Sequence, residues 1–198
     1  TYPTNSLLGG HPFANKEISN LASSWHQTLT QLSGNIRHPS EPIQRFLEQA
    51  LTNTPECLQA KAERLRTIVG GRISVLPPDA RHVDYNLIPI TIADGCLYKC
   101  AFCKVKTATP FTARTTDEIN RQIADLKNLC AGDLANVNAL FLGEHDALQA
   151  GADRVCHSIE EAYRQFGFAD SYLKGHNTFI FGSVTSLLES PERLFSDL

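Results

Sequence analysis

The feature of the sequence that most constrains its fold is a change of apolar period that begins at Asn86. Three short runs rich in β-branched and aromatic residues, at 86–92, 137–142 and 178–181, are typical of buried parallel strands. Between these runs, apolar residues recur at helical spacing. Strands that alternate with helices form parallel sheets through right-handed crossovers. The sequence therefore predicts an α/β fold from about residue 86 onward.

The predicted helices of this part have recognisable ends. Thr115 and Glu118 have the spacing of a capping box that opens the first helix. The second helix ends at Gly167, a residue suited to a C-cap. A third helix is predicted to open at Ser190-Pro191-Glu192, and the sequence stops within two turns of it. Three strand–helix units cannot close a barrel.

The first 70 residues favour a small helical module. Three amphipathic helices are predicted there, over 16–33, 40–51 and 54–69. Thr54-Pro55-Glu56 combines an N-cap, a proline at the first helical position and an acid in the first turn. A short strand is predicted at 72–76. We therefore predict two domains: 1–84, the helical module and its lead-in, and 85–198, the α/β part.

Composition excludes several classes of protein. A net charge of -3 over 198 residues argues against a general electrostatic grip on nucleic acid, so no nucleic-acid partner is expected. No stretch reaches the roughly 18 apolar residues of a membrane helix. The start of the chain lacks the basic and apolar regions of a signal peptide. We expect a cytoplasmic protein with no membrane partner.

The chain begins at Thr1 and contains no Met. Together with the interrupted third helix, this leads us to expect a truncated piece of a longer protein. A barrel sheet that stops after its third strand leaves an unpaired edge and an uncovered interior. We therefore predict that these 198 residues alone are unstable or aggregated, and inactive.

Three of the six cysteines, Cys96, Cys100 and Cys103, form the pattern C-x3-C-x2-C directly after the first predicted strand. On such a loop, three thiolates can each bind one iron of a cubane cluster and leave the fourth iron open to a further ligand. A structural zinc site would need a fourth donor; the predicted strand separates His82 from the loop. A ferredoxin would need a fourth cysteine, and Cys130 and Cys156 fall on apolar helix faces. A non-catalytic iron–sulfur or zinc binding module remains the alternative.

With Phe102 between the last two cysteines, this stretch resembles the cluster loop of radical S-adenosylmethionine enzymes, C-x3-C-x-aromatic-C. The resemblance covers roughly Asn86 to Phe181. It implies the first half of a partial (β/α)6 TIM-like barrel, with a [4Fe-4S] cluster on the three cysteines and S-adenosylmethionine on the open iron. Phe102 would lie beside the adenine, and a flavodoxin- or ferredoxin-like protein would donate electrons.

The resemblance also implies an activity, the reductive cleavage of S-adenosylmethionine to methionine and a 5′-deoxyadenosyl radical, with an unknown substrate. In the family, a Gly-Gly-Glu turn after the second strand holds the amino group of the cofactor. The corresponding turn here is Gly143-Glu144-His145-Asp146. A charged acceptor forms the stronger bonds to an ammonium group, and a neutral imidazole offers one acceptor at best. We expect Glu144 and Asp146 to contribute more than His145.

Parallel topology brings these motifs together. Residues that follow the carboxyl ends of successive parallel strands converge on one face of a barrel. The cysteine loop follows the first predicted strand, and Gly143–Asp146 follows the second. The two segments are therefore expected to be neighbours.

Overall fold

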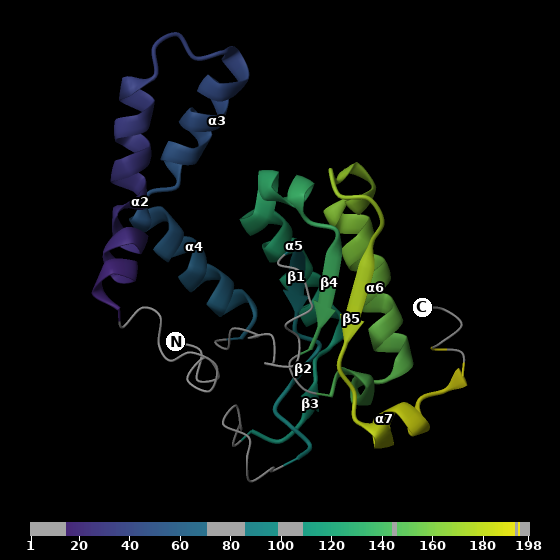
Figure 1. Ribbon diagram of the computed structural model, residues 1–198. Coiled ribbons are helices and arrows are strands. Elements are labelled where there is room, and N and C mark those ends of the chain that lie inside the picture. Colours follow the sequence, from purple (N-terminus) through teal and green to yellow (C-terminus); the bar gives the residue numbers. More distant parts are fainter. Residues whose placement is uncertain (1–14, 71–85, 99–108, 144–145, 193, 195–198) are drawn as a thin grey trace. The chain divides into compact units, whose positions relative to one another are not determined.

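A computed structural model of the chain describes residues 15–70, 86–98, 109–143, 146–192 and 194 (Figure 1). The chain divides into two compact units, Thr1–Arg64 and Leu65–Leu198. The predicted domain boundary at 84/85 and the predicted strand at 72–76 lie outside the described residues. The described elements make a mixed α/β protein with a small parallel sheet.

The N-terminal helices are α2 (Lys16–Asn35), α3 (Glu41–Thr52) and α4 (Pro55–Ile68), as the sequence predicts. The boundary between the two units falls within α4. Side chains satisfy backbone donors where α2 and α4 begin: the Glu17 N–H donates to Asn15 Oδ1 at 2.9 Å, and the Cys57 N–H to Thr54 Oγ1 at 3.2 Å. His26 Nε2 lies 3.0 Å from the Leu51 carbonyl oxygen and so links α2 to α3.

The second unit is built on a parallel sheet of β1 (Leu87–Ile90), β4 (Ala139–Leu142) and β5 (Asn177–Ile180), in that spatial order. The strands are in register, with Ile90 beside Leu142 and Leu142 beside Ile180. The crossover helices are α5 (Thr116–Cys130), between β1 and β4, and α6 (Ala152–Phe166), between β4 and β5 (Figure 1). The predicted β-α-β-α-β order is confirmed.

One core joins both crossover helices to the same face of the sheet. Its largest fully buried residues come from β1, the segment after it, β4, α5, α6 and the C-terminal segment: Ile90, Ile92, Leu140, Leu142, Ile119, Ile123, Leu126, Val155 and Leu194. Burying one such aliphatic side chain contributes about 1.5–3 kcal/mol. Since strand side chains alternate, Pro89 and Phe141 belong to the other face. There the Phe141 ring meets Phe181 edge-to-face, with centroids 5.3 Å apart.

Local signals predicted both crossover helices well. α5 begins with a complete Thr115–Glu118 capping box, and α6 ends at Gly167, which adopts the left-handed conformation (φ 64°). The 3-10 helices η3 (Ala131–Asn136), η4 (Ala147–Ala150) and η5 (Phe168–Asp170) lie in the connections. The sequence did not predict α7 (Val184–Glu189), which Ser183 caps. Helical conformation resumes at Glu192, where a third helix was predicted to open.

Within the described residues, the parallel sheet does not close into a barrel. None of the described helices is both long and apolar enough to cross a membrane.

Candidate functional site

The segments that follow the three parallel strands are bonded together at the carboxyl edge of the sheet. After β4, the Gly143 N–H donates to the carbonyl of Ile90 at the end of β1, at 2.8 Å. The Ala147 N–H donates to the carbonyl of Phe181, directly after β5, also at 2.8 Å. Gly143 and Ala147 are therefore fixed to the two neighbouring strand ends, and polar side chains from three segments can meet there.

The cysteine loop leaves this edge through a narrow base. A short antiparallel ladder joins β2 (Ala93–Asp94) to β3 (Thr112–Ala113), so the intervening segment begins and ends at one place. Gly95 has φ 79°, and a Cβ there would stand 2.1 Å from the Pro110 carbonyl oxygen. Only glycine fits so close an approach with this backbone conformation.

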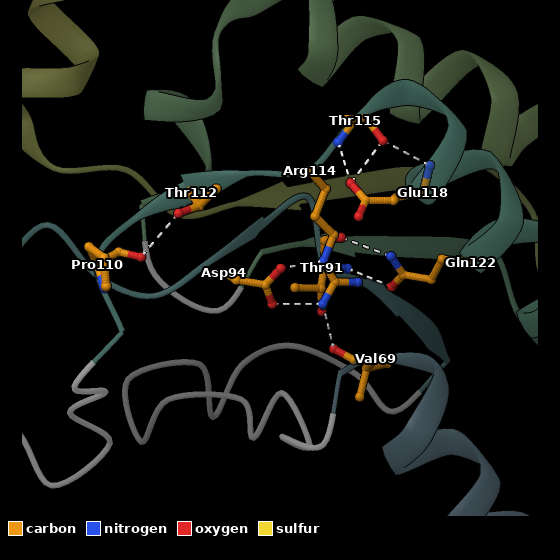
Figure 2. Close-up of polar contacts among 9 residues, drawn as sticks. All are labelled: Val69, Thr91, Asp94, Pro110, Thr112, Arg114, Thr115, Glu118 and Gln122. Atoms are coloured by element: carbon orange, nitrogen blue, oxygen red, sulfur yellow. Dashed lines mark hydrogen bonds and ion pairs between the residues drawn. The ribbon is translucent and has the colours of Figure 1, made fainter.

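An ion pair closes the same base (Figure 2). Arg114 Nε and Nη2 lie 2.7 Å from Asp94 Oδ2 and Oδ1 respectively, a bidentate arrangement. Arg114 Nη2 also donates to the Val69 carbonyl at 3.2 Å. The Arg114 side chain is 12% exposed and that of Asp94 48%, so solvent screens the pair from the Asp94 side.

Two further contacts hold the strand and helix that flank the loop (Figure 2). The Thr91 N–H donates to Gln122 Oε1 at 2.9 Å, and Gln122 Nε2 donates to the Thr91 carbonyl at 2.8 Å. The buried amide of Gln122 thus acts as a strand partner for Thr91. At the start of α5, two hydrogen bonds from Thr115 lower the pKa of Glu118. The bond from the Thr115 backbone has the larger effect and the bond from its hydroxyl the smaller.

Of the predicted cluster ligands, the structure describes Cys96, which is half-buried and forms no disulfide. The Tyr98 N–H donates to Cys96 Sγ at 3.4 Å. Cys100 and Cys103, and with them Phe102, lie outside the described residues. Among the His, Cys, Asp and Glu side chains in the described segments, no three lie together as a metal site; two of the three cysteines fall outside that search.

In the turn after β4, the structure describes Gly143 and Asp146; Glu144 and His145 lie outside the described residues. Gly143 has φ 74°, and a Cβ there would stand 2.8 Å from Ala147 Cβ. Asp146 is 4% exposed. Its Oδ2 accepts a hydrogen bond from Ser186 Oγ at 2.7 Å, whereas its buried Oδ1 has no partner within the described part of the chain.

A second buried oxygen without a partner in the described segments, Thr91 Oγ1, lies just after β1. Because Ile90 and Ile92 point into the core, the Thr91 side chain points to the opposite sheet face. Buried polar atoms are nearly always bonded, so two such oxygens at one edge call for ligands or water. Leaving the Asp146 carboxylate oxygen without a partner costs more free energy than leaving the Thr91 hydroxyl without one, because the carboxylate is the more polar group.

Sequence reasoning missed three residues of this edge: Tyr98, Ser183 and Ser186. Tyr98 Oη donates to Ser183 Oγ at 2.9 Å, and Ser183 Oγ donates to Ser186 Oγ at 3.0 Å. Ser183 had a usable signal, since serine is a common N-cap and this one follows soon after the strand. Ser186 and Tyr98 had none, because their partners are distant in the sequence.

Searches against protein-family profiles, curated proteins and solved structures found no match to this chain. The site must therefore be interpreted from its own residues. It combines the half-buried Cys96 thiol with the buried Asp146 carboxylate, one oxygen of which has no partner in the described part of the chain. A chain of hydroxyl groups lies between the two. Such an edge can bind a ligand that carries an amino group.

Proposed function

We propose that this protein is a radical S-adenosylmethionine enzyme. The observation that carries the proposal is Asp146 Oδ1, which has no partner among the described residues and is buried at the same sheet edge from which the cysteine loop departs. A buried carboxylate oxygen without a donor is costly unless a ligand supplies one. The N–H groups of an amine would supply donors, and the charge of the carboxylate would strengthen these bonds. The amino group of S-adenosylmethionine has this chemistry.

The donor set also fits a cluster. Cys96, Cys100 and Cys103 would bind three irons through thiolates, and the open iron would take the cofactor's amino and carboxylate groups. Asp146, with Glu144, would accept hydrogen bonds from that amino group, and Phe102 would contact the adenine. When bound, the cluster supplies the electron that cleaves S-adenosylmethionine reductively to methionine and a 5′-deoxyadenosyl radical.

Strand order supports the finer fold proposal, the first half of a partial (β/α)6 TIM-like barrel. The order β1-β4-β5 follows the chain, and one core packs both crossover helices on the same face. In a doubly wound sheet, the order in which strands are added reverses at one point, and helices cover both faces. A sheet that adds each new strand on one side, with all helices outside, is the pattern of a barrel. Active sites of barrels lie at the carboxyl ends of the strands.

The chain's own residues would prepare the site before any ligand binds. Gly95, the β2–β3 ladder and the Arg114–Asp94 pair fix the base of the cysteine loop. Ser186 orients the Asp146 carboxylate through Oδ2. Such preorganisation lowers the cost of ordering the site on binding. A small electron-donor protein, flavodoxin- or ferredoxin-like, and a cytoplasmic location follow from the same proposal.

The decisive test is cofactor cleavage by the complete protein. The protein is reconstituted with iron and sulfide without oxygen, reduced, and incubated with S-adenosylmethionine. We expect 5′-deoxyadenosine and methionine in equal amounts, and neither product from Cys96→Ala. If a cluster forms but S-adenosylmethionine stays intact, the enzyme proposal is wrong and a non-catalytic iron–sulfur module is favoured. If the site binds zinc and no cluster forms, it is a zinc module.

A further inference from the structure

A chain of three hydroxyl groups leads from the cysteine loop to the Asp146 carboxylate. Tyr98 Oη donates to Ser183 Oγ at 2.9 Å, Ser183 Oγ to Ser186 Oγ at 3.0 Å, and Ser186 Oγ to Asp146 Oδ2 at 2.7 Å. A hydroxyl has one proton to donate. With each proton directed towards the next oxygen, all three bonds run towards the carboxylate. Such a chain is polarised in one direction and its bonds strengthen one another.

Ser186 has a competing acceptor, Gln149 Oε1, at 3.1 Å. The carboxylate oxygen is closer, at 2.7 Å, and carries charge, so it takes the proton. Ser186 is 3% exposed and Asp146 4%, so water does not compete at this end of the chain. Tyr98 is 43% exposed, so solvent can reach this end of the chain.

Tyr98 also contacts a predicted cluster ligand. Its backbone N–H donates to Cys96 Sγ at 3.4 Å, while its side chain starts the hydroxyl chain. One residue therefore connects the thiol to the carboxylate through Ser183 and Ser186. Loss of the Tyr98 hydroxyl removes the first donor of the chain and changes how firmly Oδ2 is held.

We propose that Tyr98 is a positioning residue that links Cys96 to Asp146, so that amino-group binding at Asp146 depends on the Tyr98 hydroxyl. The inference rests on the proposed function, since the amino group is that of S-adenosylmethionine. Bonds to Oδ2 fix the rotation of the carboxylate and leave Oδ1 for the ligand. Coupling between two sites is reciprocal, so a ligand at Asp146 also favours the hydrogen-bonded position of the Tyr98 hydroxyl.

The test is Tyr98→Phe, which removes the hydroxyl and keeps both the ring and the N–H bond to Cys96. Wild-type and variant proteins are reconstituted anaerobically, and S-adenosylmethionine affinity is measured by equilibrium dialysis. Loss of one neutral hydrogen bond predicts a Kd higher by about two- to twelvefold. S-adenosylmethionine should change the electron paramagnetic resonance spectrum of the reduced protein. The variant should need a higher cofactor concentration than wild type for the same change, by the same factor as the Kd. Iron content and the spectrum without cofactor should stay as in wild type.

Two comparisons make the result specific. Ser183→Ala should weaken binding in the same direction, and the double variant should be no weaker than the weaker single variant, because both act through one chain. Ser183 also caps α7, so Ser183→Ala could fail to fold for that reason alone. In that case the result with Tyr98→Phe decides the test. The matched control is Tyr172→Phe, the same chemical change at a side chain that is 82% exposed, where no effect is expected.

The possible failures are distinguishable. Equal affinity in wild type and Tyr98→Phe would overturn the coupling and leave the proposed function intact. Additive effects of Tyr98→Phe and Ser183→Ala would also overturn it, because the residues would then act separately. So would a lower iron content in Tyr98→Phe, since the hydroxyl would then support the loop alone. A wild-type protein that assembles its cluster but binds no S-adenosylmethionine would overturn both proposals.

Discussion

Asp146 is the side chain on which the candidate site most depends. A buried carboxylate is expensive unless its charge is balanced, and here one oxygen has a donor while the other has none within the described residues. Ser158, also fully buried, bonds to the carbonyl four residues before it and needs no ligand. The helix that carries Ser158 supplies its hydrogen-bond partner, whereas a ligand would have to supply the donor for Asp146 Oδ1.

The first prediction concerns the charge of this turn. Asp146→Asn should weaken S-adenosylmethionine binding by about 1.5–3 kcal/mol, the value of a hydrogen bond to a charged group. Glu144→Gln should weaken it in the same direction, and His145→Gln should have the smallest effect. Equilibrium binding to each reconstituted variant measures this. If His145→Gln alone weakens binding, the order of importance is wrong.

The second prediction separates the cysteines. Cys96→Ala, Cys100→Ala and Cys103→Ala should each abolish the brown absorbance of the cluster. Cys130→Ala should retain it, because the partly buried Cys130 side chain packs against the core from the end of α5. Iron and sulfide content provides the check. A cluster lost with Cys130→Ala would indicate four protein ligands and remove the open iron.

At the scale of elements, the base of the cysteine loop is the critical structure. Gly95→Ala would bring a Cβ to 2.1 Å from the Pro110 carbonyl at a positive φ, so the β2–β3 ladder cannot close unchanged. Strain of this kind costs on the order of 1–3 kcal/mol. The matched control is Gly132→Ala, where a Cβ meets nothing within 4 Å, and a change within about 0.5 kcal/mol is expected. Urea unfolding measures both; equal stability of the two variants would contradict the clash.

The sequence predicted the helices whose ends form through interactions between residues close together in the chain, and it missed two short strands that need distant partners. The capping box of α5 and the glycine end of α6 are local, so Thr115, Glu118 and Gly167 predicted them directly. The strands β2 and β3 have two residues each and exist through pairing with each other across the loop. The hydrogen bond that holds Asp146 Oδ2 comes from Ser186, forty residues away along the chain. No local pattern carries such information.

At the scale of the whole molecule, two compact units meet within α4 along the chain. Unfolding of the complete protein should therefore depart from a single two-state transition. Cluster assembly should raise the melting temperature of only one transition, that of the unit beginning at Leu65. The reason is that a ligand stabilises the unit that binds it. Calorimetry with and without reconstitution measures this, with Cys96→Ala as the control. A uniform shift of every transition would show that the units unfold together.

The amide of Gln122 has a consequence for how the sheet can grow. The carbonyls of Asn86 and Ile90 accept hydrogen bonds from the β4 side, so the backbone groups of Pro89 and Thr91 point to the outer edge of β1. Pro89 has no N–H to offer, and Gln122 occupies both polar groups of Thr91. That edge is therefore a poor template for another strand, which protects it from edge-to-edge aggregation. A strand that joins this sheet will add along β5.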